Sequence, residues 1–146
     1  MHNNIYVDTN IVIDMCDNTR AMHENSFAHI TKYMEQEACE LFINSDTLAN
    51  VFYILSNRST LDTSEVLDKM YFVSEIFTLV QIASDDVLMA LDLCSDSAKS
   101  YKDYEDAVQY VCAKKIEADL IVTNDKKFVS FDIEICSTIH QDTNNE

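Results

Sequence analysis

Three aspartates stand where an α/β protein presents reactive groups. Asp8 directly follows the apolar run 5–7, Asp125 follows the apolar run 120–122, and Asp106 opens an expected helix. Carboxylates that are brought together repel one another and raise one another's pKa, so such a group favours a bound cation. Oxygen ligands with few histidines favour magnesium or manganese over zinc.

Alternating strand and helix patterns predict the elements that would bring these residues together. Strands alternating with helices imply parallel pairing and right-handed crossovers, and hence a three-layer α/β/α sandwich around a mainly parallel sheet of four to five strands. In such sheets, sites form beyond the carboxyl ends of the strands. The expected strands cover 5–7, 41–43, 78–82, 120–122 and 131–135, and the expected helices include 21–38, a stretch capped by Ser45, 64–76, a stretch around 87–94, and 103–117.

Glycine and proline are both absent from the 146 residues. A P-loop, a dinucleotide-binding turn and a nucleophile elbow all need glycine where the backbone meets a phosphate or turns sharply. Nucleotide-cofactor chemistry by those routes is therefore excluded. We expect asparagine, for example Asn57, to supply the left-handed helix ends that glycine normally forms.

The chain is strongly acidic, with 10 Lys plus Arg against 26 Asp plus Glu, a net charge of −16 and a pI near 4.3. Such a surface repels polyanions at long range. A nucleic-acid substrate then requires locally concentrated positive charge, from Lys126 and Lys127, from Lys99 and Lys102, or from a metal ion. Otherwise, the acidic residues keep the protein soluble or bind a basic partner protein.

The size and the apolar runs predict one domain without a membrane anchor. No apolar run approaches the roughly 20 residues that span a bilayer, and no export signal is recognisable at residues 1–4, so we expect a cytoplasmic protein. The scattered cysteines indicate reduced thiols that mostly fill the core, and the histidines do not cluster as zinc ligands would. The cysteines are Cys16, Cys39, Cys94, Cys112 and Cys136.

Three segments resemble, in order, the motif regions of the PIN domain family, which includes VapC-type toxins. They are Ile5-Tyr6-Val7-Asp8-Thr9-Asn10, the Asp106-Ala107 pair within 104–110, and Ile121-Val122-Thr123-Asn124-Asp125-Lys126-Lys127-Phe128. The resemblance covers essentially the whole chain, as a single PIN-like domain over residues 1–138 followed by a polar tail over 139–146.

This resemblance implies a metal-dependent endoribonuclease and the toxin of a toxin–antitoxin pair. Asp8, Asp106 and Asp125 would be catalytic and would hold Mg²⁺ or Mn²⁺, which activates water and stabilises charge on the scissile phosphate. RNA would be the substrate, a basic antitoxin protein a partner, and a homodimer the assembly. The supporting residues would be Asn10, Asn50, Asp103 and Thr123.

One position departs from the family pattern. PIN nucleases usually carry a glutamate in the helix after the second strand, where this chain has Asn50. Asparagine offers a neutral oxygen and no charge, so two metals would become one, or catalysis would weaken. Asp46, four residues earlier on the same helix face, is a possible substitute, although its first-turn position favours stabilisation of the helix dipole.

Plainer interpretations stay open for each residue. Asp8 or Thr9 could cap the first helix, Asp103 and Asp106 could form a capping box, and Asp125 could be a turn residue. Glu105 is expected to face solvent.

Two other functions stay open for the whole chain. One is a PIN-like binding module without useful catalysis. The other is a phosphotransferase that uses Asp8 as its nucleophile, although such enzymes usually carry a second acid where this chain has Asn10.

Overall fold

The computed structural model describes residues 3–96 and 101–139, in which five parallel strands form one sheet with the order β3-β2-β1-β4-β5. The prediction of an α/β sandwich with a parallel sheet of four to five strands is confirmed. The elements are β1 (Asn3–Val7), α1 (Thr9–Cys16), α2 (His23–Met34), β2 (Cys39–Asn44), α3 (Ser45–Arg58), α4 (Thr63–Ile76), β3 (Thr78–Val80), α5 (Ser84–Ser95), α6 (Tyr104–Lys115), β4 (Leu120–Val122) and β5 (Glu134–Cys136).

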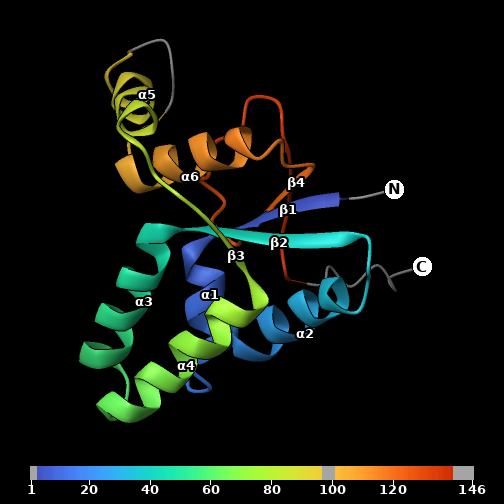
Figure 1. The fold of residues 1–146 in the computed structure, drawn as a ribbon, viewed down its shortest axis with the longest axis vertical. Coiled ribbons are helices and arrows are strands. Elements are labelled where there is room, and N and C mark those ends of the chain that lie inside the picture. The colour runs from blue at the N-terminus through green and yellow to red at the C-terminus, as the bar shows by residue number, and fades with distance from the viewer. Residues whose placement is uncertain (1–2, 97–100, 140–146) are drawn as a thin grey trace.

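Helices cover both faces of the sheet (Figure 1), with α1 to α4 on one side and α5 and α6 on the other. Side chains alternate between the two faces of a strand, and β1 follows this rule. Ile5 and Val7 pack in the core beneath α1 to α4, whereas Tyr6 packs in the core beneath α5 and α6. Because both faces are covered, the central strands carry apolar buried residues at 5–7, 41–43 and 121–122.

The strand register aligns the carboxyl ends of β1 and β4. Val7 pairs with Val122, and the Asp8 amide donates to the Val122 carbonyl at 2.9 Å. The residues that follow these two strands therefore leave the sheet side by side. This alignment places the segment beginning at Asp8 next to the segment beginning at Thr123.

The left-handed helix end lies elsewhere than predicted. Asn57 is inside α3, where its side-chain Nδ2 donates to the Tyr53 carbonyl at 2.7 Å. Among the described residues, only Glu117 has a positive φ, at 53°. It follows α6, where its amide donates to the Lys114 carbonyl and the Ala118 amide donates to the Ala113 carbonyl. These bonds form a Schellman motif, so glutamate occupies the position that favours glycine.

Several predicted boundaries are also wrong by a few residues. Asn44 rather than Ser45 caps α3, because the Asn44 side chain accepts the Thr47 amide at 3.0 Å. The third strand ends at Val80, its last pairing position, and the last strand begins at Glu134 after a turn closed by Ser130. The second helix covers only His23–Met34 of the predicted range.

The cysteines only partly match their predicted core role. All five are free thiols, but only Cys16 and Cys112 are buried, and the others are partly exposed. Within the described ranges, no helix has the length and apolarity needed to cross a membrane. The predicted tail lies outside the described residues from position 140 onward.

Candidate functional site

Asp8 is a buried carboxylate held by two side chains. Asp8 directly follows β1 and is only 3% exposed. Gln109 Nε2 donates to Asp8 Oδ1 at 2.9 Å, and Thr123 Oγ1 donates to Oδ2 at 2.7 Å. Asp8 occupies the N-cap position of α1, yet its side chain makes no capping hydrogen bond. Burial raises the pKa of Asp8, and the bonds from Thr123 and Gln109 partly offset that rise.

A buried polar network extends from Asp8 into three helices. Gln109, on α6, also accepts the Thr9 amide at 3.0 Å through its Oε1. Thr9 Oγ1 lies 3.2 Å from Thr47 Oγ1, and the Thr47 amide is held by Asn44. The orientation of the Asp8 carboxylate is therefore fixed from α1, α3 and α6 together. Sequence reasoning missed Gln109, whose signal is a lone amide within the apolar run 107–113.

The N-terminus of α6 brings three further carboxylates to the same place. Asp103 caps the helix by accepting the amides of Glu105 at 2.9 Å and Asp106 at 3.3 Å, which confirms the predicted cap. Asp106 is half-buried. Burial, followed by repulsion from Asp103 and Asp8, raises the pKa of Asp106 to about 7.

The expectation that Glu105 simply faces solvent is wrong in part. Glu105 is exposed, but it lines the same cavity as Asp8 and Asp106. Burial and the charge of Asp8 raise the pKa of Glu105. The position just after the N-cap brings this side chain toward the loop that follows β1, which spacing along the helix alone did not reveal.

Asp125 combines a turn role with a place in the cavity. Its amide donates to Thr123 Oγ1 at 3.1 Å, and its Oδ1 accepts the Lys127 amide at 2.9 Å. These bonds match the turn residue that the plainer interpretation proposed. Thr123 thus touches two of the three predicted catalytic residues, because it also donates to Asp8.

The three predicted catalytic aspartates line one cavity of about 350 Å³. Asn10, Asn50 and Asp103 also line it, whereas Thr123 lies behind Asp8 and contacts the site only through its hydrogen bonds. Asp46 is absent from this cavity and lines an adjacent one. The full lining is Asp8, Thr9, Asn10, Ile13, Arg20, Asn50, Tyr53, Ile54, Arg58, Asp103, Glu105, Asp106 and Asp125.

Positive charge at the cavity comes from arginines rather than from the predicted lysines. Arg20 and Arg58 line it, while Lys126 lines a neighbouring cavity and Lys99 lies outside the described residues. Five acidic side chains face these two arginines in the lining. None of the ion pairs found in residues 3–96 and 101–139 involves Asp8, Asp106 or Asp125.

The donor chemistry of this cavity fits a hard divalent cation. Asp8, Asp106 and Asp125 have no ion-pair partner among the described residues, and burial followed by like charges raises the pKa of Asp106, so these carboxylates gain from a nearby cation. Among the residues that the structure describes, no three His, Cys, Asp or Glu side chains are grouped so that they could hold a metal. Magnesium retains several waters and usually binds through one or two protein carboxylates, so it needs no closed protein cage.

The parallel sheet of this order, with an aspartate at the end of its central strand and further carboxylates on α6, defines a PIN-type α/β fold. The PIN domain family matches residues 4–127, and the chain belongs to this family. Sequence comparison finds Ribonuclease VapC1 of Aquifex aeolicus strain VF5, which is 34% identical over 134 residues covering 92% of this chain and 90% of that protein.

Solved structures share the fold at lower identity. VapBC2 from Rickettsia felis, bound to a DNA fragment from its promoter, matches 92% of this chain and 98% of that chain, with a TM-score of 0.66 and 15% identity. VapC20 of Mycobacterium tuberculosis, a sarcin–ricin loop cleaving toxin, matches 80% of this chain and 86% of that chain, with a TM-score of 0.65 and 13% identity. At such identities the likeness shows the fold alone.

Proposed function

We propose that this protein is a metal-dependent PIN-type endoribonuclease and the toxin of a toxin–antitoxin pair. The observation that carries the proposal is the meeting of Asp8, Asp106 and Asp125 in one cavity, where none of them forms an ion pair with another described residue. The ribonuclease relative VapC1, which aligns with 92% of the chain, supports the reaction class. RNA is then the substrate, and phosphodiester hydrolysis the reaction.

The three proposed catalytic aspartates would bind the metal, and neighbouring side chains orient Asp8. Asp8, Asp106 and Asp125 would hold Mg²⁺ or Mn²⁺. When bound, such an ion activates water and offsets the negative charge of the phosphodiester. Gln109 Nε2 and Thr123 Oγ1 keep the Asp8 carboxylate in one orientation, because each donates to a different oxygen. Such support commonly matters as much for metal affinity as the ligands themselves.

Four supporting residues would position the catalytic side chains, water or RNA. Asp103 fixes the first turn of α6 and thereby the position of Asp106. Asn10 and Asn50 offer amide groups that could orient water or the RNA backbone without adding charge. Thr123 links Asp8 to Asp125 through its hydroxyl.

A basic antitoxin is the partner that the charge distribution favours. The chain carries a net charge of −16, and the cavity lining holds five acidic side chains. A partner segment that inserts a basic side chain among these carboxylates would block the site and gain from complementary charge. The likeness to the solved VapBC2 structure supports the existence of an antitoxin partner. We further propose a homodimer, a single domain over residues 1–138 and action in the cytoplasm.

Cleavage of RNA by wild type and Asp8→Asn protein, with magnesium or manganese, tests the enzymatic proposal. The loss of a metal ligand should reduce the rate by about a hundredfold or more. Asp68→Asn is the matched control, because Asp68 is an exposed carboxylate on α4 outside the cavity. Equal RNA degradation by wild type and Asp8→Asn would rule out the proposed enzyme.

A PIN-like binding module is the second candidate, and Asn50 favours it. This neutral residue lines the cavity at the point where the family usually supplies a glutamate. Titration calorimetry with manganese separates the two candidates. Heat of binding at millimolar metal supports the nuclease, and its absence together with an inactive wild type supports the binding module.

A further inference from the structure

Both arginines of this chain lie at the candidate site. The sequence contains only Arg20 and Arg58, with all its other basic charge on lysines. Both line the cavity that contains Asp8 and Asp125, and no lysine lines it. Arginine differs from lysine in presenting a planar fork of donors that matches a phosphate group. In a chain with a net charge of −16, this placement of its only two arginines calls for a ligand-based explanation.

Arg20 is held in place by a buried carboxylate. Its Nε donates to Asp14 Oδ1 at 2.7 Å, and Asp14 is only 5% exposed. Ser26 Oγ donates to the other Asp14 oxygen at 3.2 Å, so the carboxylate is itself fixed. The guanidinium has five N–H donors, and this pair uses the one on Nε. The remaining donors are available to an anion in the cavity, with little side-chain entropy left to lose.

Arg58 lies at the far end of the helix that forms one wall of the cavity. Asn50, Ile54 and Arg58 recur every four residues on α3 and share one face. At 1.5 Å per residue, Arg58 lies about 12 Å along the helix axis from Asn50. No ion pair of Arg58 is found within the described ranges. The wall therefore extends from the carboxylate end of the cavity to an exposed guanidinium.

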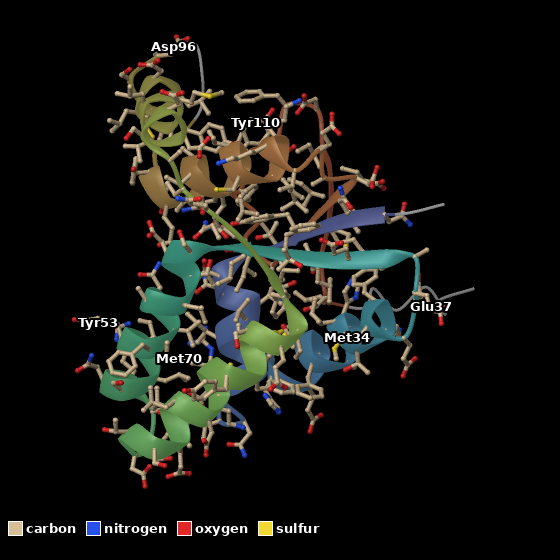
Figure 2. All side chains as sticks on the ribbon, viewed as in Figure 1. Met34, Glu37, Tyr53, Met70, Asp96 and Tyr110 are labelled. Carbon is tan, nitrogen blue, oxygen red and sulfur yellow. The ribbon has the colours of Figure 1, made fainter. Side chains whose placement is uncertain are left out.

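An exposed aromatic ring lines the same cavity. Tyr53 is 62% exposed, a large fraction for an aromatic residue. Figure 2 shows Tyr53 on the outer side of α3, away from Met70 of α4. Its ring is thus available to a flat ligand group that reaches along α3.

We propose that Arg20, Arg58 and Tyr53 form a subsite for single-stranded RNA. The two guanidinium groups bind backbone phosphates beside the one that is cleaved, and the Tyr53 ring stacks on an unpaired base. Guanidinium–phosphate pairs and base–aromatic stacking are the two contacts that single-stranded nucleic acids use most. This subsite rests on the proposed ribonuclease function and adds how the RNA is held.

The arrangement favours RNA over an acidic peptide. A peptide carboxylate could pair with the arginines, but it leaves the exposed Tyr53 ring without a role. A duplex keeps its bases stacked inside, so stacking on Tyr53 requires an unpaired segment. Arg58 lies beyond Asn50 along α3, and Arg20 lines the same cavity from the segment between α1 and α2. Two guanidinium groups from separate segments suit a chain of repeated phosphates better than one isolated anion.

RNA binding in a cleavage-deficient background tests the subsite. Asp8→Asn protein is titrated, with magnesium present, into a fluorescein-labelled single-stranded RNA of mixed sequence, and the anisotropy is followed at several salt concentrations. Adding Arg58→Ala should raise Kd about tenfold, and the slope of log K against log salt should fall by about 0.7, the value for one lost phosphate contact. Tyr53→Leu should raise Kd about fivefold or more.

Lys32→Ala is the matched control for Arg58→Ala. Lys32 is an exposed cation in the last turn of α2, outside the cavity, and its removal changes the net charge equally. Kd and salt slope should stay unchanged in this variant. Arg20 is tested as Arg20→Lys, because alanine would leave the buried Asp14 carboxylate unpaired and threaten folding. Lysine keeps the charge but lacks the fork, so Kd should still rise.

Two outcomes overturn the subsite. One is unchanged RNA binding in both Arg58→Ala and Tyr53→Leu, with thermal unfolding as in the background. The other is binding of a labelled poly-glutamate peptide that depends on Arg58 while RNA binding does not, which assigns the arginines to an acidic partner. Both leave the enzyme proposal intact, because that proposal fails only if Asp8→Asn cleaves RNA like wild type.

Discussion

Asp8 and Asp106 face the same cavity but are held in opposite ways. Asp8 is buried, and both of its oxygens accept hydrogen bonds from side chains that are themselves fixed. Asp106 is half-exposed on the first turn of α6, with Asp103 and Glu105 as near neighbours in the chain. Burial and four nearby carboxylates raise its pKa to about 7.

We call the buried surroundings of Asp8 the floor of the cavity, and the half-exposed first turn of α6 around Asp106, together with Asn50 of α3, its rim. The floor around Asp8 is completed by the protein itself, because no buried side-chain nitrogen or oxygen in the described ranges lacks a hydrogen-bond partner. The rim around Asp106 carries a carboxylate that is in none of the ion pairs found among residues 3–96 and 101–139. A ligand cation therefore gains most at the rim, while the floor sets where it is placed.

Removal of Gln109 should have the largest effect on stability. Gln109→Leu leaves Asp8 Oδ1 and the Thr9 amide each without their hydrogen-bond donor or acceptor, while Thr123 still donates to Asp8 Oδ2. We expect a loss of about 3 kcal/mol in the free energy of unfolding. Asn50→Ala, which alters the rim instead, should change it by less than about 0.5 kcal/mol. Urea unfolding measures both, and similar losses for the two variants would contradict the floor and rim distinction.

The pH dependence of the free energy of unfolding should report the raised pKa of Asp106. The folded state holds a proton on Asp106 up to pH about 7, whereas an ordinary aspartate releases it near 3.8. The folded state thus binds more protons across this window, and its stability falls as pH rises.

Asp106→Asn should therefore flatten that fall. After allowance for solvent screening at this half-exposed site, the difference should be on the order of 1 kcal/mol between pH 5 and about pH 7.5. Urea unfolding in EDTA is the measurement. A steeper fall in Asp106→Asn than in wild type would refute the prediction.

A substitution just after the C-terminal end of α6 should change stability without affecting the cavity. Glu117 has a φ of 53° and closes the helix in a left-handed conformation. Glu117→Gly removes that strain, although glycine gains freedom in the unfolded chain, so a net gain of about 0.5 kcal/mol is expected. RNA cleavage and manganese binding should not change. A loss of stability would show that the Glu117 side chain has a role of its own.

Asp103→Asn should give the smallest effect on stability. Asparagine caps helices about as well as aspartate, so the free energy of unfolding should move by only a few tenths of a kcal/mol. Because the charge of Asp103 helps to raise the pKa of Asp106, that pKa should fall. Carboxyl NMR titration of the metal-free protein would detect the fall. An unchanged titration of Asp106 would mean that the charge of Asp103 does not contribute to its raised pKa.

The sequence predicted the strands better than the buried polar contacts. Apolar runs and helical spacing sufficed for the parallel sheet, and the rule about strand ends located the three aspartates. The PIN resemblance then added their proposed roles. Gln109 was missed because its two contacts join residues about a hundred positions apart, which no local pattern encodes.

Local competition explains the remaining errors. Asn57 has the right chemistry for a left-handed helix end, but α3 continues through it to Arg58. Glu117 has the wrong chemistry and still takes that conformation, because the chain must turn from α6 into β4. Glu105 was assigned to solvent from helix spacing, although the loop after β1 lies near enough for it to line the cavity.

The absence of proline also has a consequence for folding kinetics. Isomerisation about bonds preceding proline takes tens to hundreds of seconds and often limits refolding. This chain of 146 residues has no such bond, so time spent in denaturant creates no slowly refolding population of that origin. Refolding traces should be the same after one second or one hour in urea, and any slow phase must then come from sheet assembly or subunit association.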